Sequence, residues 1–484
     1  MSKNVVATNF IWRFMERISA QLVTFFVSIF IARILSPADY SAISIILVFI
    51  TFANILVSNG FATALIQSKK TDSLDFSSVF YFSFAFSIIL YFILFFIAPY
   101  IAKWYNMPIL SPTLRVLGIR IIISSINSLQ HSYVARNMAF RKFFFSTLGG
   151  TIISAIVGVI CAVNKMGVWA LVLQYLTNTL IDTVVLWITV KWRPTREFSL
   201  HRLARLLSYG WKLLTSALIG AIYDDLRTLI IGKAYTKEDL AFYSKGQQFP
   251  KLIMTNVSTS ITSVVFPYFS KLQDDKERLK KSIRKTLRTS TVIIAPLMIG
   301  LLTIATPLVK LLLTNKWIDC VPFLQISCLF YLISSIYTIY LQGYKSIGKS
   351  GLALIIELVD DVFGIILVIL FLKKGAFYIA SVMVISRVIA CVVCFYYNKK
   401  LFDMKMTEQF YDIVIPIVFS LIMSVSISLF NLININYILR MIVQCVCGFI
   451  VYSFMCLIFR YPFLKSIFAL FDDRKKVKIS EEEI

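Results

Sequence analysis

The stretch IARILSPADYS at residues 31–41 occurs a second time at residues 231–241 as IGKAYTKEDLA, at an offset of 200 positions. Both copies have a basic residue in third place and an acidic residue in ninth, Asp39 and Asp239. In each copy an apolar run ends, and the hydroxyl and acidic residues that follow are typical of the cap and first turn of the next helix. Each copy stands at the start of a block of six apolar runs, so we interpret the match as an internal repeat.

The composition sets the class of protein. Of 484 residues, 58% are apolar and only 15% are charged, whereas a soluble domain is about a quarter charged. A membrane-spanning helix needs roughly 20 residues, so the chain can supply about fourteen of them. This composition excludes a soluble enzyme, a disordered protein and a nucleic-acid-binding protein. The net charge of +24 therefore indicates membrane topology rather than a nucleic-acid ligand.

Apolar runs bounded by charges or by Pro, Gly and Asn clusters predict an all-α polytopic membrane protein with fourteen spans. The fourth, seventh and eighth runs are the weakest because charged or hydroxyl residues interrupt them. An even number of spans per repeat gives both halves the same orientation, which predicts two pseudo-symmetric six-helix lobes around a central cavity. The predicted spans are 14–34, 42–66, 76–99, 114–135, 143–163, 168–190, 209–233, 252–270, 290–313, 321–343, 352–371, 376–397, 413–430 and 437–459.

The predicted spans divide the chain into four parts. We expect an amino-terminal lobe at 1–195, a second lobe at 196–405, a helix pair at 406–465 and a cytoplasmic tail at 466–484. The connections on one side carry most of the loop Lys and Arg residues, which places both termini in the cytoplasm. The amino terminus has no cleavage site after a short apolar core, so we expect it to be retained.

One cytoplasmic connection, at 271–289, is a predicted amphipathic helix with a strongly basic face, KLQDDKERLKKSIRKTLRT. We interpret this segment as an anchor that lies on anionic lipid headgroups. The alternative is a docking site for a cytoplasmic partner.

Polar residues within the spans form the candidate site, because ionisable groups at this depth face a cavity or a partner. Arg13 and Arg17 lie on one face of the first span, and Tyr223 and Arg227 lie on the corresponding face of its repeat mate, the seventh. We expect both stripes to line the central cavity. The alternative is a polar seam between helices of one lobe.

Acidic residues are candidates for cation coupling. Asp224 and Asp225 lie beside Arg227, and we expect Asp224 to pair with that arginine. A carboxylate buried here could carry a proton, or it could form a permanent ion pair. The eleventh span holds Glu357, Asp360 and Asp361, and Glu357 and Asp361 share a face. Cation coupling there competes with a salt bridge to Arg387 of the twelfth span.

The other intramembrane charges stand singly. Arg120 and Asp182 occupy spans four and six, and Arg120 is a candidate for binding phosphate because a guanidinium matches phosphate oxygens bidentately. Two histidines, His131 and His201, cannot assemble a metal site, and nothing resembles a nucleophile with its base. We therefore expect no catalytic residue, no metal and no cofactor.

Several stretches resemble the polysaccharide transporter family of the multidrug, oligosaccharidyl-lipid and polysaccharide exporter superfamily. FIARILSPADYSAISI at 30–45 and NGFATALIQSK at 59–69 resemble its amino-terminal signature. The likeness continues through 206–233 and 341–352 and covers nearly the whole chain. The chain departs from the pattern at Ser41, where many relatives carry Gly. The resemblance implies twelve core helices in two lobes followed by a helix pair.

The resemblance also implies a function. It is that of a Wzx-type flippase, which moves an undecaprenyl-pyrophosphate-linked oligosaccharide across the bacterial cytoplasmic membrane by alternating access. The product would be lipopolysaccharide O-antigen, capsule or exopolysaccharide. We expect Arg13, Arg17 and Arg227 to contact the pyrophosphate, with Arg120 a further candidate, and Tyr223 to stack on sugar rings.

Expected partners are the lipid-linked cargo, membrane lipids, a polysaccharide polymerase and a chain-length regulator, with the protein itself a monomer. A multidrug–cation antiporter of the same superfamily is the alternative function, although its cationic cargo disfavours clustered arginines. A membrane glycan polymerase or acyltransferase is a third, which the short outer loops disfavour.

Overall fold

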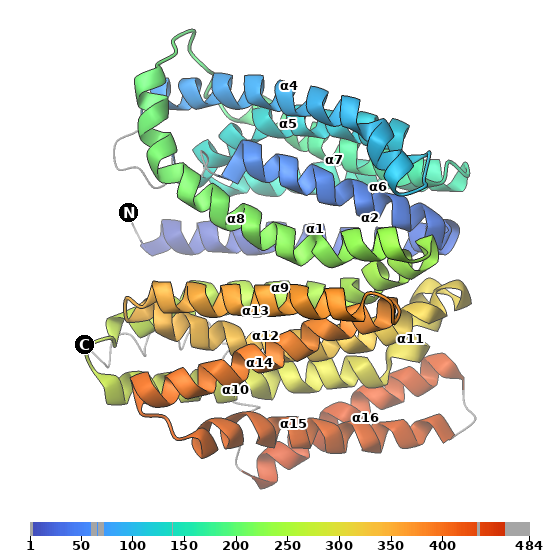
Figure 1. Cartoon of the computed structure of the whole chain (residues 1–484), viewed down its shortest axis with the longest axis vertical. Helices are drawn as coiled ribbons and strands as arrows, with labels where there is room; N and C mark the ends of the chain where they lie inside the picture. The colour runs from blue at the N-terminus through green and yellow to red at the C-terminus, as the bar shows by residue number, and fades with distance from the viewer. Residues whose placement is uncertain (1–2, 60–64, 66–71, 138, 433–435, 460–484) are drawn as a thin grey trace. The chain divides into compact units, whose positions relative to one another are not determined.

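The computed structural model describes residues 3–59, 65, 72–137, 139–432 and 436–459, and within these every regular element is a helix (Figure 1). The expected tail at 466–484 lies outside the described residues. The chain separates into two compact units, Met1–Ala241 (unit 1) and Phe242–Ile484 (unit 2). Each unit is described by itself below.

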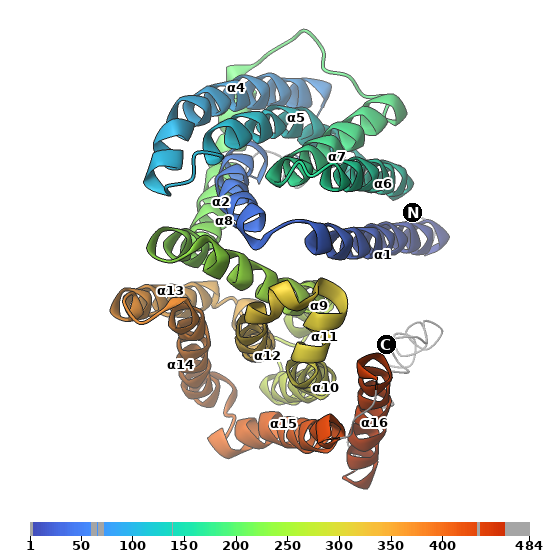
Figure 2. The same ribbon diagram turned by 90° about the vertical axis from the view of Figure 1, so that its right-hand side faces the viewer.

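Unit 1 holds the first repeat and one further helix. In it α6 packs between α1 and α7, α5 packs against α4 and α7, and α8 runs along α2 (Figure 2). The helices are α1 (Lys3–Ile34), α2 (Pro37–Asn54) with a π-helical end (Ile55–Asn59), α4 (Ser73–Trp104), α5 (Leu110–Arg136), α6 (Phe140–Val163), α7 (Val168–Thr189) and α8 (Leu200–Ala234).

Unit 2 holds most of the second repeat and the carboxy-terminal pair. Here α10 packs against α12 and α15, α14 packs against α12 and α13, and α15 packs against α16. The helices are α9 (Lys237–Lys271), α10 (Lys276–Thr303), α11 (Ala305–Leu313), a short 3₁₀ turn (Asn315–Cys320), α12 (Val321–Ser346), α13 (Ser350–Phe371), α14 (Ala376–Phe402), α15 (Met406–Ser428), a second 3₁₀ turn (Leu429–Leu432) and α16 (Tyr437–Ile458).

The repeated motif forms the same helix start twice. At the start of α2, Ser36 Oγ accepts from the Asp39 amide at 3.3 Å, and Asp39 Oδ2 accepts from the Ser36 amide at 3.1 Å. Before α9, the corresponding distances for Thr236 and Asp239 are 3.1 and 3.3 Å. These reciprocal hydrogen bonds satisfy amides that a helix start leaves unpaired. The predicted caps are confirmed in both copies.

Eleven of the described helices are long and apolar enough to cross a membrane, so the protein is a multi-pass membrane protein. A helix lies at each of the fourteen predicted spans, but α5, α8 and α13 are not among the eleven. All three carry charged residues; α13, for example, holds Glu357, Asp360 and Asp361. Fourteen crossings therefore remain a prediction.

Candidate functional site

The last third of α8 holds an arginine placed over a tyrosine. The guanidinium carbon of Arg227 lies 4.7 Å from the ring centroid of Tyr223, and the two residues are only 3% and 6% exposed. They are one helical turn apart, so the helix itself brings them together. A cation–π contact shielded from water contributes about 2 kcal/mol and fixes the direction of the guanidinium. Both residues were predicted to bind the cargo, and the structure brings them into contact.

The charged residues near Tyr223 and Arg227 do not form the ion pair that the sequence predicts. Asp224 is exposed and makes no ion pair within the described part of the chain, so the expected pair with Arg227 does not form. Arg227 is buried against the Tyr223 ring instead. Asp225 is half-buried, as is Arg17 on α1. Arg13 lies within α1, but its side chain is outside the described part of the structure.

Arg120 joins two helices of unit 1. Its Nε donates to Thr179 Oγ1 at 2.8 Å, and its guanidinium carbon lies 5.7 Å from the ring centroid of Tyr175. Both partners belong to α7, so this side chain links α5 to α7. Arg120 is therefore held in place by one nitrogen and one ring face rather than standing as a single charge.

The polar contact between α5 and α7 continues from Arg120 to the carboxylate of Asp182 on α7. Asn127 Nδ2 donates to Asp182 Oδ2 at 2.6 Å, and His131 Nε2 lies 3.0 Å from the same oxygen. The His131 ring stacks on Phe143 with 4.7 Å between centroids. The expectation that Asp182 and His131 stand singly is wrong. The available signal was that Arg120, Asn127 and His131 recur at steps of seven and four, along one face of α5.

In unit 2, two acidic residues of α13 have basic partners. Arg387 Nη2 lies 3.2 Å from Asp360 Oδ2, and its guanidinium carbon lies 4.4 Å from the Tyr337 ring centroid. Glu357 pairs instead with Lys345, at 3.2 Å. The predicted salt bridge to the arginine of α14 exists, but Asp360 forms it, because Asp360 is the buried acid on the packed face of α13. Asp361 is half-buried.

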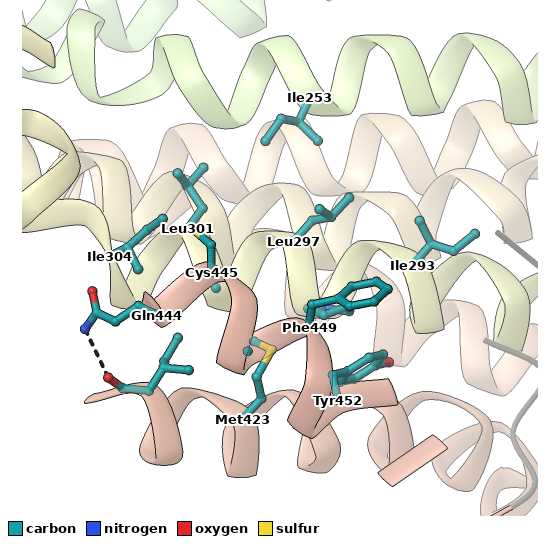
Figure 3. Close-up of a pocket in the computed structure, with 14 residues that line it drawn as sticks. Ile253, Ile293, Leu297, Leu301, Ile304, Met423, Gln444, Cys445, Phe449 and Tyr452 are labelled. Atoms are coloured by element: carbon teal, nitrogen blue, oxygen red, sulfur yellow. Dashed lines mark hydrogen bonds between the residues drawn. The ribbon is translucent and has the colours of Figure 1, made fainter. Parts of the chain in front are cut away.

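Unit 2 also contains an apolar groove of about 440 Å³ between α9 and α10 on one side and α15 and α16 on the other. Figure 3 shows Leu297 and Leu301 of α10 facing Met423 of α15 and Phe449 of α16. Gly300 and Gly448 also line it and leave space there because they lack side chains. The groove is therefore shaped for a hydrocarbon ligand.

The polar groups in this lining are partly satisfied, because Gln444 Oε1 is buried without a hydrogen-bond partner. Gln444 Nε2 donates to the Ile427 carbonyl at 3.0 Å, and the Tyr452 hydroxyl donates to the Val292 carbonyl at 2.9 Å. The sequence does not predict this groove, because the groove depends on contacts between helices far apart in the chain. Among the residues that the structure describes, no three His, Cys, Asp or Glu side chains gather as metal ligands.

The chain is similar to known proteins of polysaccharide biosynthesis. A family model described as "Polysaccharide biosynthesis protein" matches residues 30–322. The chain is 23% identical over 321 residues to the succinoglycan biosynthesis transport protein ExoT of Rhizobium meliloti. It is 25% identical over 313 residues to the lipopolysaccharide biosynthesis protein WzxC of Escherichia coli. These matches cover 66% and 63% of this chain and 65% and 63% of the relatives, slightly less than two thirds of their length.

The fold is similar to a solved structure of the lipid II flippase MurJ in an inward closed conformation. The TM-score is 0.73 with 19% sequence identity, over 95% of this chain and 99% of that one. At this identity the likeness concerns the fold alone.

Proposed function

Because the chain belongs to the polysaccharide biosynthesis protein family, we propose that it is a membrane flippase. Its cargo is an oligosaccharide repeat unit linked through pyrophosphate to undecaprenol, destined for O-antigen, capsule or exopolysaccharide. Such a head group carries many hydroxyls and a pyrophosphate, and these cannot cross hydrocarbon unaided. The protein supplies a polar route for the head and moves it by alternating access. It is a transporter and not an enzyme.

The observation that carries this proposal from the geometry is the apolar groove between α9, α10, α15 and α16. A polyprenyl tail consists of hydrocarbon alone and needs a largely apolar binding surface. Most of the groove lining is apolar, and Gln444 Nε2 and the Tyr452 hydroxyl bond to backbone carbonyls, although Gln444 Oε1 has no hydrogen-bond partner. We assign the groove to the lipid tail of the cargo.

The cationic residues of unit 1 are assigned to the head group. Arg227 is held over Tyr223, and Arg120 is fixed through Nε to Thr179, so both guanidinium groups are oriented before any ligand arrives. Preorganised guanidinium groups suit phosphate oxygens. Arg13 and Arg17 complete the proposed pyrophosphate set. The Tyr223 ring is buried beneath Arg227, so the guanidinium must leave the ring before a sugar can stack on it.

Coupling to a cation, if the transport is coupled, is assigned to α8 rather than to α13. Asp224 is exposed, and Asp225 stands next to it. In α13, Glu357 forms an ion pair with Lys345, so it is a weaker candidate for cation coupling. Asp361 is a secondary candidate.

The proposed location is the bacterial cytoplasmic membrane, with both termini in the cytoplasm. This orientation follows from the concentration of loop Lys and Arg residues on one side. We keep the division into lobes at 1–195 and 196–405 with a helix pair at 406–465 as the proposed repeat boundaries. We propose that the protein acts as a monomer, with a polysaccharide polymerase and a chain-length regulator as partners.

Deleting the gene and locating the lipid-linked intermediates tests the function. A lost flippase leaves complete repeat units facing the cytoplasm. A lost polymerase would instead leave single units that have already been translocated, and a lost multidrug–cation antiporter would change drug sensitivity alone. Complementation with the wild-type gene must restore the polymer, and either of the last two results would overturn the proposal.

A further inference from the structure

By sequence α8 opens the second repeat, yet its first turns are fastened to α4 in the first. Arg205 Nη2 lies 3.1 Å from Asp75 Oδ1, and Arg202 reaches both Asp75, at 3.6 Å, and Asp72. Asp75 is only 1% exposed. A carboxylate this deeply buried is held by its cationic partners, because leaving it unpaired is strongly unfavourable. The Arg202 guanidinium also holds the pKa of Asp72 below its ordinary value of 3.8.

Apolar packing reinforces this fastening. Leu203 and Leu206 of α8 are buried in one core cluster with Phe76 of α4 and Trp192 of the preceding connection. The connection itself is bonded to α4, because the Thr195 amide donates to Ser77 Oγ at 2.9 Å, and the Ser199 amide donates to Ser78 Oγ at 3.0 Å. The start of α8 is thus bound to α4 by charge, by hydrogen bonds and by apolar contact.

The other end of α8 returns to the other end of α4. Lys233 Nζ donates to the Trp104 carbonyl at 2.6 Å and lies 4.7 Å from the centroid of its ring. The Tyr105 hydroxyl, just after α4, donates to the Leu229 carbonyl of α8 at 3.3 Å. Between these points α8 curves along the bundle (Figure 1) and contacts α2. The helix is therefore held at both ends by one partner.

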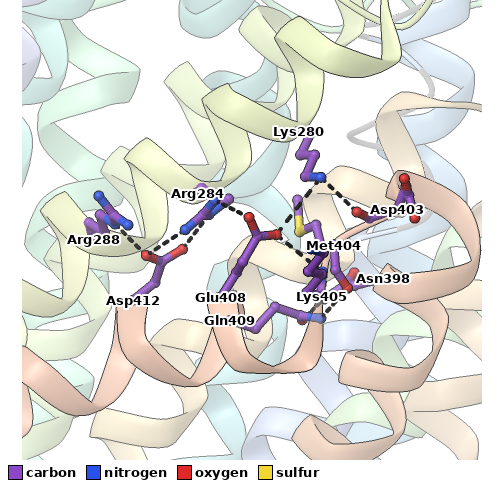
Figure 4. A network of polar contacts seen from close by, with 10 residues as sticks. All are labelled: Lys280, Arg284, Arg288, Asn398, Asp403, Met404, Lys405, Glu408, Gln409 and Asp412. Atoms are coloured by element: carbon purple, nitrogen blue, oxygen red, sulfur yellow. Dashed lines mark hydrogen bonds and ion pairs between the residues drawn. The ribbon is translucent and has the colours of Figure 1, made fainter.

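Unit 2 repeats the arrangement with α15 on α10, the repeat mate of α4. Figure 4 shows Arg284 and Arg288 of α10 directed at Asp412 of α15. The Arg284 Nε–Asp412 Oδ2 distance is 2.7 Å, and Asp412 is fully buried. At the far end, Thr303 Oγ1 lies 2.6 Å from Ser424 Oγ. In unit 1 the acid lies on α4 and the arginines lie on α8, whereas in unit 2 the arginines lie on α10 and the acid lies on α15. In both units an ion pair joins the third helix of the repeat to the helix that follows the repeat.

This arrangement also revises the interpretation of the basic segment at 271–289. Its inward face is not free for lipid or for a partner, since Lys280 lies 3.8 Å from Glu408, and Arg284 pairs with Asp412. Lys281 and Lys285 remain exposed on the other face. The lipid-anchor interpretation is therefore limited to that outward face.

We propose that the helix following each repeat is a strap that stays fastened to the third helix of that repeat throughout transport. The consequence for the proposed flippase is that α8 moves with unit 1. Tyr223 and Arg227 are then carried by the same body as Arg17 and Arg120, and the pyrophosphate set is not divided when the two units move. The transport consequence rests on the proposed function, whereas the fastening itself does not.

The proposal is tested by replacing the noncovalent contacts between α4 and α8, and between α10 and α15, with covalent cross-links. The eight cysteines are free thiols and are first replaced. Thr303→Cys with Ser424→Cys is then oxidised to a disulfide, and Asp75→Cys with Arg205→Cys is bridged by a short bifunctional thiol reagent. We expect each stapled protein, in vesicles, to translocate undecaprenyl-pyrophosphate-linked sugar within about twofold of its unstapled form. Single-cysteine variants treated with the same reagents are the matched controls.

A loss of translocation of tenfold or more on stapling would overturn the proposal, because α8 or α15 would then have to leave its partner. For the disulfide-linked pair, the loss must also disappear on reduction. A distance measurement covers the case in which the cysteine pairs fail to fold. Spin labels are placed at Tyr81 of α4 and Ile219 of α8, both exposed positions. A second pair joins Ile219 to Leu354 of α13 in unit 2, which is also exposed.

Under any condition that changes the Ile219–Leu354 distance, we expect the Tyr81–Ile219 distance to stay constant. A shift of the Tyr81–Ile219 distance together with the other would show that α8 leaves unit 1, and the proposal would fail. If wild-type protein translocates no lipid-linked sugar, the proposed function fails. The two spin-label distances still show whether α8 stays bound to α4.

Discussion

Replacing Asp412 by asparagine removes the negative charge at the centre of the α10–α15 contact. The wild-type carboxylate accepts from Arg284 at 2.7 and 3.2 Å and from Arg288, and it has no exposure to water. Breaking a fully buried ion pair from one side costs about 3–5 kcal/mol. Here Arg288 is 45% exposed and can return to water, and Arg284 keeps Glu408 at 2.9 Å. The loss is therefore close to one charged hydrogen bond, about 2–3 kcal/mol.

This loss should appear as a lower unfolding temperature. One kcal/mol shifts the midpoint by about 2–4 °C in a body of roughly 200 residues, so we expect a decrease of about 5–10 °C. The measurement is a fluorescence melt in detergent at one fixed scan rate, since membrane proteins commonly unfold irreversibly. Asp274→Asn is the matched control, because Asp274 is exposed and has no ion partner among the described residues. If both variants melt within a degree of wild type, the contact does not hold α15 in place.

Four further outcomes are expected. Leu297→Trp fills the groove and should lower translocation at least tenfold, whereas Leu354→Trp, on an exposed part of α13 outside the groove, should not; equal activities would remove the groove from the lipid path. Arg227→Ala should abolish glycan export while the protein still inserts, with Arg227→Lys retaining part of it, and normal export by the alanine variant would exclude this arginine from the site. Because a guanidinium lowers the pKa of Asp72 below 3.8, this carboxylate stabilises the fold above that pH and stops doing so as the pH falls through its folded value. The melting difference between wild type and Asp72→Asn should therefore shrink between pH 6 and pH 3, and a constant difference would contradict the role of the charge. Finally, Lys285→Cys should react with an impermeant thiol reagent only after the membrane is opened, and direct labelling from outside would invert the topology.

Features that depend on neighbouring residues could be predicted from the sequence. The caps at Ser36 and Thr236 involve partners three positions away, so the local pattern was sufficient. The helix positions followed from apolar runs, because each run must be long enough to cross the hydrocarbon. Local spacing was not sufficient at Arg227: the sequence predicted a pair with Asp224, and the guanidinium lies over the ring of Tyr223, also one turn away.

Contacts between distant helices could not be predicted in the same way. Helix periodicity shows which residues share a face but not which helix that face meets. For this reason the salt bridge of Arg387 was expected without the knowledge that Asp360 would form it. The pairing of His131 with Asp182 spans 51 residues and depends on how α5 packs against α7. The groove depends on four helices and carries no sequence motif at all.

The exchange of acid and base between the two ionic contacts has a consequence for hybrid proteins. In unit 1 the third helix contributes Asp75 and its strap contributes arginines; in unit 2 the third helix contributes the arginines and its strap contributes Asp412. A chimera that transplants only α4 into the place of α10 would set carboxylate against carboxylate, and the reverse graft would set arginine against arginine. Each third helix can therefore be transferred only together with its own strap, so the smallest interchangeable piece of this protein is a pair of helices that are not consecutive in the chain.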